Sequence, residues 1–227
     1  DYTGVAGGED FNFAVYAQAS TINAFIGVES ASLVTQIRTA DGATFTNDGT
    51  RYSLHLAVVN DKLVRDMRQS DAVTSWGLLT YSEDGTNWNE PIVLGDVNTG
   101  ITSILNLGRV AIVTKTDSIW AVDFEASPIV LTELFHSIAN TSNGVGANVW
   151  KGVAYIPFEG RLMAVSGDFD NGFVVTLSAG PEALPQWDSP WGAGRIVAVL
   201  PGTRFAVAVA DTVSPDSLTP LLSPGGG

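Results

Sequence analysis

The stretch Ala111-Ile-Val-Thr-Lys-Thr-Asp-Ser-Ile-Trp-Ala121 joins two apolar runs through a short polar turn. The same layout recurs in Ala57-Val-Val-Asn-Asp-Lys-Leu-Val-Arg65 and in Ala154-Tyr-Ile-Pro-Phe-Glu-Gly-Arg-Leu-Met-Ala164. Phe205-Ala-Val-Ala-Val-Ala-Asp-Thr-Val213 is a fourth copy, and Phe13-Ala-Val-Tyr-Ala-Gln-Ala-Ser20 suggests a fifth. Counted from Ala14 through Ala57, Ala111 and Ala154 to Val207, the spacings are 43, 54, 43 and 53 residues.

This spacing has a structural meaning, because a repeat of about 40–50 residues that holds about four strands is typical of β-propeller blades. One blade cannot bury both of its faces, so neighbouring blades must cover them. We therefore predict an all-β fold, a β-propeller-like array of about four to five blades, complete or partial. The alternative is a β-sandwich with coincidental hairpins.

The rest of the chain agrees with strands. Short runs rich in β-branched residues are bounded by turn pairs that supply a left-handed position, as hairpins require. These pairs are Asp41-Gly42, Asp48-Gly49, Asp84-Gly85, Asn143-Gly144 and Asn171-Gly172. Residues 61–68 fit a helix or a strand equally well, and 128–135 are also ambiguous. We expect a propeller-like domain over residues 1–210 and a tail rich in Pro, Gly and Ser over 211–227.

Composition excludes several classes of function. The 227 residues include 11 Lys or Arg against 24 Asp or Glu, a formal net charge of −13. Phosphate binding depends on clustered Lys and Arg, so nucleic acid and anionic membrane surfaces are disfavoured as partners. The absence of Cys removes disulfides, thiolate zinc sites and a Cys nucleophile. No apolar run reaches the roughly 18 residues of a membrane-spanning helix, so we expect no membrane insertion.

One turn carries a motif with a known counterpart. Ser82-x-Asp84-Gly85-x-x-Trp88 resembles the Asp-box of sialidase-like propellers, Ser-x-Asp-x-Gly-x-Thr-Trp, although it is one residue shorter and has Asn87 in the place of Thr. We expect Asp84 to accept backbone N–H groups, Gly85 to be left-handed and Trp88 to cover the hairpin. The resemblance implies a structural motif away from any active site.

A second resemblance extends over residues 50–170. The stretch 143–162, with Trp150-Lys-Gly152 leading into Tyr155-Ile-Pro157 and a Gly-Arg hairpin, looks like blade sequences in propeller proteins of tailed-phage virions. Residues 77–88 are similar to another part of those blades. The resemblance implies a structural or receptor-binding part of a virion.

The sequence indicates no catalytic centre, metal site or cofactor. A glycosidase needs two carboxylates about 5–10 Å apart, and the acidic candidates are Asp117, Asp123, Glu125, Glu159, Asp168 and Asp170. His55 and His136 lie 81 residues apart, without Cys or paired spacing, and so form no zinc motif. The loop beginning at Asp168 resembles the start of a calcium loop, but its twelfth position is Ala179 and not Glu.

Tryptophan is the most informative residue that remains. Trp187 and Trp191 lie in a loop with two prolines, and Trp150 belongs to a turn. An exposed Trp stacks on a sugar ring or anchors a protein interface. These three are the candidate ligand-binding residues, against the simpler interpretation that they pack onto a blade.

Three functions compete. The first is a non-enzymatic structural or adhesive component of a larger assembly, a phage tail, neck or fibre-associated protein, with other protein chains and copies of itself as partners. The second is a carbohydrate-binding propeller that recognises a surface glycan. The third is a glycoside hydrolase. The first interpretation places the chain in a virion, and the second places it outside the cell.

Overall fold

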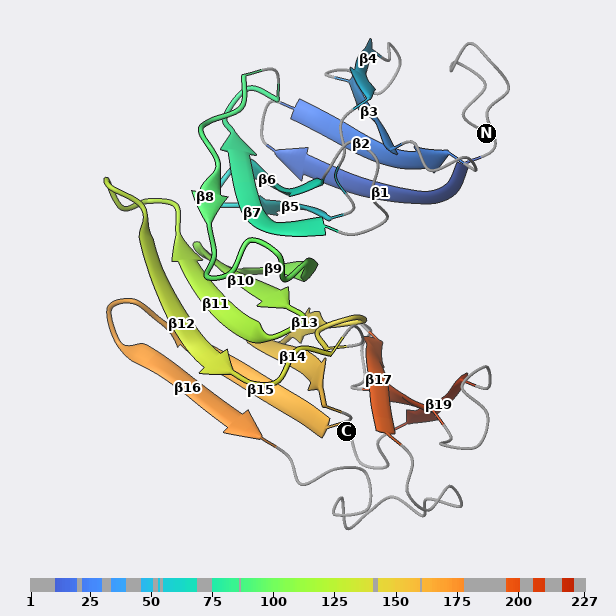
Figure 1. The fold of residues 1–227 in the computed structure, drawn as a ribbon, viewed down its shortest axis with the longest axis vertical. Helices are drawn as coiled ribbons and strands as arrows, with labels where there is room; N and C mark the ends of the chain where they lie inside the picture. The colour runs from blue at the N-terminus through green and yellow to red at the C-terminus, as the bar shows by residue number, and fades with distance from the viewer. Residues whose placement is uncertain are drawn as a thin grey trace. The chain divides into compact units, whose positions relative to one another are not determined.

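The computed structural model describes residues 11–19, 22–29, 34–39, 46–50, 53, 55–68, 75–85, 87–140, 143–159, 161–177, 195–200, 206–210 and 218–222. Every helix or strand assigned among them is a β-strand (Figure 1). The chain divides into two compact units, Asp1–Ile104 and Leu105–Gly227, and the division falls within one strand, β9.

The first unit holds two four-stranded antiparallel sheets among its described residues. In each sheet the strands follow one another along the chain, so neighbours in sequence are neighbours in space. The first sheet consists of β1 (Phe11–Ala19), β2 (Ile22–Glu29), β3 (Val34–Thr39) and β4 (Thr46–Thr50). The second consists of β5 (Leu56–Val59), β6 (Lys62–Arg68), β7 (Ser75–Ser82) and β8 (Ile92–Val93).

Three more sheets follow in chain order. The third sheet consists of β9 (Ile101–Leu107), β10 (Val110–Lys115), β11 (Ser118–Asp123) and β12 (Val130–His136). The fourth consists of β13 (Asn148–Trp150), β14 (Val153–Phe158), β15 (Arg161–Asp168) and β16 (Gly172–Leu177). The fifth has three described strands, β17 (Arg195–Leu200), β18 (Ala206–Ala210) and β19 (Leu218–Leu222).

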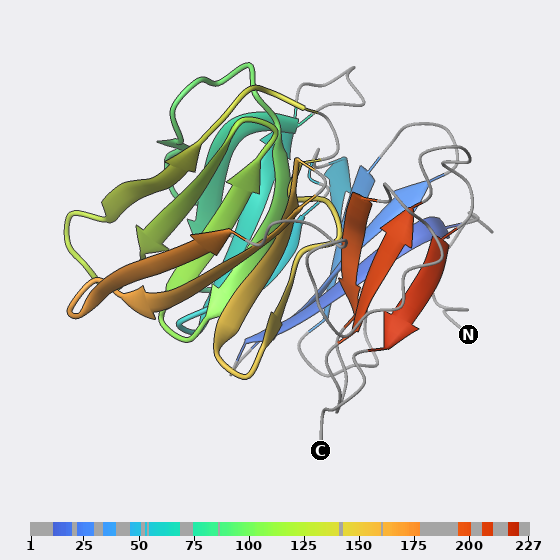
Figure 2. The same ribbon diagram turned by 90° about the horizontal axis from the view of Figure 1, so that it is seen from below.

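The core of the second unit lies between the third and fourth sheets, whose faces pack together (Figure 2). Because β10 and β11 are buried on both faces, they read as nearly continuous apolar runs and not as an alternating pattern. Burial of this apolar surface is the main term that stabilises the pair of sheets. The buried cluster comprises Leu105, Val110, Ile112, Ile119 and Ala121 from the third sheet with Ala154, Ile156, Phe158, Met163 and Val165 from the fourth.

The predicted all-β, propeller-like array is confirmed: among the described residues there are five small sheets of consecutive antiparallel strands. A β-sandwich would place the strands in two large facing sheets instead. Both ambiguous segments form strands, since residues 62–68 lie in β6 and residues 130–136 in β12. β19 lies within the expected tail, 211–227, and pairs with β18.

The repeated segments do not occupy the same strand position in every sheet, although a blade repeat would place them there. Ala111 and Ala154 lie in the second strands of their sheets, whereas Ala57 lies in a first strand. Every hairpin of an antiparallel meander has the same apolar–polar–apolar layout, so this pattern does not distinguish one hairpin of a blade from the next.

The structure confirms three of the predicted turn glycines and contradicts one predicted turn. Gly85, Gly144 and Gly172 have φ of +72°, +74° and +83°, as expected for turn glycines. The predicted turn at Asp48-Gly49 is wrong, because both residues lie within β4. β4 pairs with β3 through a register shift between Thr35 and Ile37, so strand pairing overrides the local turn preference. Asp41-Gly42 lies outside the described residues.

Candidate functional site

The turn after β7 is built by the side chains of Ser82 and Asp84. Ser82 is fully buried, and its Oγ accepts hydrogen bonds from the backbone N–H of Asp84 at 3.3 Å and of Gly85 at 2.8 Å. Asp84 in turn accepts from the backbone N and from Nδ2 of Asn87, each at 2.7 Å. These bonds fix the turn locally, in the manner of Asx-turns.

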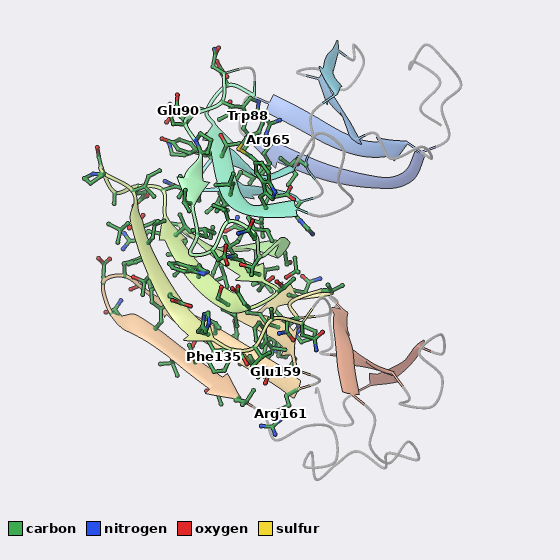
Figure 3. All side chains as sticks on the ribbon, viewed as in Figure 1. Arg65, Trp88, Glu90, Phe135, Glu159 and Arg161 are labelled. Atoms are coloured by element: carbon green, nitrogen blue, oxygen red, sulfur yellow. The ribbon has the colours of Figure 1, made fainter. Side chains whose placement is uncertain are left out.

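Trp88 closes this turn over a buried cation. The guanidinium carbon of Arg65, on β6, lies 3.5 Å from the centroid of the Trp88 ring, and Arg65 is only 6% exposed (Figure 3). A guanidinium over an indole face is an attractive cation–π contact. The face of Trp88 that Arg65 covers is therefore occupied by the protein itself, and the contact ties the turn to the sheet.

Trp150 is the candidate ligand-binding residue that the structure describes. It lies at the end of β13, half-buried, with its ring centroid 6.4 Å from that of Tyr155 on β14. Nζ of Lys151 lies 4.5 Å from the centroid of the Trp150 ring, and Lys151 occupies the β13–β14 turn with φ of +49°. Two rings and an ammonium group thus meet at one turn. Trp187 and Trp191 lie outside the described residues.

At the opposite end of β14, polar groups join the third sheet to the fourth. Asn143 is 1% exposed; its Nδ2 donates to the carbonyl of Thr116 at 2.9 Å, and its Oδ1 accepts from the backbone N of Glu159 at 2.8 Å. Thr116 lies in the β10–β11 turn and Glu159 in the β14–β15 turn. One buried amide therefore connects two sheets, a role that the sequence did not reveal beyond the Asn-Gly turn signal.

The same end of the third sheet contains a buried cation. Lys115 is fully buried, and its Nζ lies 3.7 Å from Oδ1 of Asp117, which also accepts from Oγ of Ser118 at 2.7 Å. A buried charge is tolerated only with such compensation. Nearby, Oγ of Ser137 donates to the carboxylate of Glu159, which is exposed beside Arg161 (Figure 3). Sequence reasoning listed Asp117 and Glu159 as acids and missed Lys115.

His55 is paired, although the sequence showed it only as a histidine in a strand-like run. Its Nδ1 lies 3.2 Å from Oδ2 of Asp66, and its backbone N donates to Oδ1 at 2.9 Å. Asp66 is fully buried. The register of β5 with β6, in which Leu56 faces Arg65, places residue 55 opposite residue 66. The separate histidine, His136, contacts Glu133 at 2.8 Å and is exposed.

The carboxylates in the turn between β15 and β16 bind backbone and side-chain groups of the same chain. Asp168 accepts from the backbone N of Asn171 and of Asp170, and these bonds, led by that from Asn171, hold the pKa of Asp168 below its ordinary value. The carboxylate of Asp170 binds Arg109 and raises the pKa of that guanidinium, while Glu125 lies 3.5 Å from the same side chain.

Most of the acidic candidates therefore have turn-building or ion-pairing roles. The sixth, Asp123, accepts from the backbone N of Glu125 at 2.9 Å. Within the part of the chain that the structure describes, no three side chains of His, Cys, Asp or Glu gather in a way that would hold a metal ion. The same residues include no helix with the length and apolar character needed to cross a membrane.

Comparisons with known proteins bear on the fold. No protein-family model matches the chain, and no curated protein does. A solved streptogramin B lyase matches 92% of this chain and 68% of its own, with a TM-score of 0.56 and 7% identity. Virginiamycin B lyase from Staphylococcus aureus matches 91% of this chain and 68% of its own, with a TM-score of 0.55 and 11% identity.

AztD from Citrobacter koseri gives a similar result, with 92% of this chain and 58% of that chain covered, a TM-score of 0.52 and 10% identity. At such identities the likeness concerns the arrangement of the chain and not its chemistry. The similar structures are β-propeller-like, and this chain shares that fold.

Proposed function

We propose that this protein is a non-enzymatic structural or adhesive component of a larger protein assembly. The observation that carries the proposal is a set of exposed apolar side chains on the last strands of two neighbouring sheets in the second unit. Val130 on β12 is 41% exposed, and Val174 and Leu177 on β16 are 62% and 44% exposed. Exposed apolar surface that gathers into one patch marks protein–protein contact sites, so these residues are the candidates for such a contact.

The roles of the acidic residues support the same reading. Asp84, Asp123 and Asp168 bind backbone N–H groups of their own turns, and Asp170 binds Arg109. A glycoside hydrolase would instead direct two carboxylates at a bound sugar. The acidic composition is accordingly a consequence of building many hairpin turns. That the assembly is a virion rests on the sequence resemblance of residues 50–170 to tailed-phage propellers.

A glycan-binding function is the second candidate, favoured by the cluster of Trp150, Lys151 and Tyr155. Aromatic faces stack on the C–H faces of sugars, and an adjacent ammonium group favours an acidic sugar. Trp150→Ala should then abolish binding on a glycan array that includes acidic oligosaccharides, while Trp88→Ala, which disturbs a ring covered by Arg65, serves as the matched control. Binding that is equally sensitive to both changes would reflect unfolding.

Fractionation of the natural source material by size tests the assembly proposal. The chain should migrate in a particle far larger than its own 23.9 kDa, and quantitative mass spectrometry should give a fixed copy number relative to the other chains. Recovery only as a free monomer with activity on a polysaccharide would contradict it.

A further inference from the structure

The sequence contains two Asn-Gly pairs, Asn143-Gly144 and Asn171-Gly172. Asparagine has a chemically labile side chain. It is most labile before glycine, because glycine has no Cβ to keep its backbone N away from the carboxamide carbon of the asparagine. The two pairs have the same local chemistry, so a difference in their reactivity must come from the structure around them.

Asn143 is buried and its carboxamide is fixed. The residue is 1% exposed; its Nδ2 donates to the carbonyl of Thr116 at 2.9 Å, and its Oδ1 accepts from the backbone N of Glu159 at 2.8 Å. The backbone N of Gly144, which is the group that would attack, donates to the carbonyl of Pro157 at 2.7 Å. Reaction at Asn143 therefore requires a local opening that breaks these bonds.

Asn171 lies at the surface, in the turn between β15 and β16, and Gly172 is exposed as well. Its Nδ2 donates to the two carboxylate oxygens of Asp168, at 3.0 and 3.1 Å, and among the described residues no other group holds its carboxamide. Gly172 has a φ of +83°, and a Cβ added to it would meet no atom within 4 Å outside its chain neighbours. It is the first residue of β16, so its N–H is released by fraying of the strand end, without loss of the sheet.

A third asparagine shows what the following residue contributes. Asn87 is exposed, and its backbone N and its Nδ2 donate to the carboxylate of Asp84, each at 2.7 Å. The carboxylate of Asp168 accepts from the same two groups of Asn171. The two turns therefore hold their asparagines in the same way, but Asn87 is followed by Trp88, whose side chain obstructs attack by its own backbone N.

We propose that Asn171 is a site of spontaneous deamidation in the folded protein, and that Asn143 and Asn87 stay unmodified. The backbone N of Gly172 attacks Cγ of Asn171 and loses its proton; the Cγ–Nδ2 bond breaks, and the side-chain nitrogen takes up that proton and leaves as ammonia. The new Cγ–N bond closes a succinimide ring. Water then opens the ring: cleavage of the new bond gives aspartate, and cleavage of the original peptide bond gives isoaspartate. Water is the only co-reactant, and the inference is independent of the proposed assembly role.

Either product disturbs the turn in which it forms. Aspartate at position 171 places a carboxylate where Nδ2 of Asn171 now donates to Asp168, and two carboxylates at that distance repel. Isoaspartate lengthens the backbone of the turn by one methylene, which displaces Gly172 from its place opposite Asp168. The modification therefore loosens the beginning of β16, the strand that carries the exposed Val174 and Leu177.

Peptide mass spectrometry of the aged full-length chain tests the assignment, and the other two asparagines are its internal controls. The folded chain is held at mildly alkaline pH, digested, and sequenced by fragmentation to locate each replacement of –NH2 by –OH. Asn171 should be modified at least about tenfold faster than Asn143, which shares its sequence, because Asn143 must first open locally. Asn171 should exceed Asn87, which shares its turn, by a similar factor. Methylation by an isoaspartyl methyltransferase measures the isoaspartate product.

The same chain unfolded in urea gives the reference rates. Without structure, the two Asn-Gly pairs should react at similar rates, and Asn87 should remain slow because of Trp88. The inference is overturned if the folded chain modifies Asn143 or Asn87 as fast as Asn171, or if Asn171 reacts in urea and not in the folded chain.

An Asp168→Ala variant tests whether the turn sets the rate. It releases the carboxamide of Asn171 and should speed its modification several-fold, since attack requires the side chain to rotate away from Asp168. Asp84→Ala, which releases Asn87 in the same way, is the matched control; it should leave the rate at Asn171 unchanged and Asn87 slow. A rate at Asn171 that Asp168→Ala leaves unchanged or lowers would contradict a reaction governed by release of this carboxamide.

Discussion

β12 and β16 occupy the same place in neighbouring sheets, yet their outer surfaces differ. β12 carries Glu133 and His136 and is interrupted by a register shift in its pairing with β11. β16 is uncharged and regular. Both strands pack inward on one core, through Phe135 and Phe173 respectively. β12 and β16 are therefore equivalent in position but differ in their outward side chains, so they need not have the same function.

The largest expected effect comes from removing the anchor of β12. Phe158 is 1% exposed and contacts Phe135 edge to face, with ring centroids 5.6 Å apart. Phe158→Ala should lower the free energy of unfolding by about 3–5 kcal/mol, as for large cavities in other cores. Urea unfolding followed by tryptophan fluorescence measures this. Phe173→Ala, at a half-buried ring on β16 itself, should cost clearly less; an equal loss would mean that both strands are anchored alike.

The buried amide that joins the two sheets should have the next largest effect. Asn143→Ala leaves the backbone N of Glu159 without its side-chain partner, whereas the carbonyl of Thr116 still accepts from the backbone N of Asn140 at 2.8 Å. A polar group left unpaired costs about 1–3 kcal/mol, so we expect a loss of that size in chemical denaturation. Asn148→Ala removes only a bond to the next residue and should cost much less. Similar costs for the two variants would contradict the role of Asn143.

Exchanging a charge between the two edge strands tests the comparison of β12 with β16 directly. Val174→Glu gives β16 the protection that β12 has, and it should change the free energy of unfolding by no more than about 0.5 kcal/mol, as for most surface substitutions, while it prevents association through β16. The reciprocal change, Glu133→Val, should leave β12 unable to pair, because the irregular register remains. Light scattering coupled to size-exclusion chromatography measures the mass, and so the oligomeric state, of both variants. Dimers formed by Glu133→Val would show that charge alone protects β12.

The smallest effect concerns the turn that leads into β16. The pKa of Asp168 is lowered in the folded chain, so its ionised form stabilises the fold above the unfolded pKa of about 3.9, and this contribution disappears as the pH falls through the lowered folded value. Asp168→Asn should therefore lower the Tm slightly at pH 6, and the difference should vanish near pH 2. A difference that persists at the lowest pH would mean that the effect is not ionic.

The sequence predicted the fold class because period-two apolar runs and turn pairs report directly on hairpins. It missed the phase of the repeat, since Ala57 and Ala111 lie in equivalent-looking hairpins at different places in their sheets. It also missed the pairs His55–Asp66 and Lys115–Asp117, although local features bear on both. The register of β5 with β6 would have paired the first, and a lysine at the end of a buried strand, two residues before an aspartate, indicated the second.

The exposed candidates for contact on β16 were beyond prediction for a physical reason. The run Gly172–Leu177 reads as a strand from its composition, but nothing local says whether such a strand lies at an edge or in the middle of a sheet. Edge position depends on the order of all four strands, and exposure depends on how the neighbouring sheet packs. Only the fold shows that Val174 faces outward on an edge while Val175, one residue later, packs inward.

Hydrogen–deuterium exchange of the chain within its particle and after release from it tests the central claim most directly. Releasing the full-length chain from the particle should increase amide exchange in residues 172–177 and leave residues 130–136 unchanged. That result would identify β16 as the strand that joins this chain to its assembly. Exchange at β16 that is equal in the two states, or a change confined to β12, would contradict it.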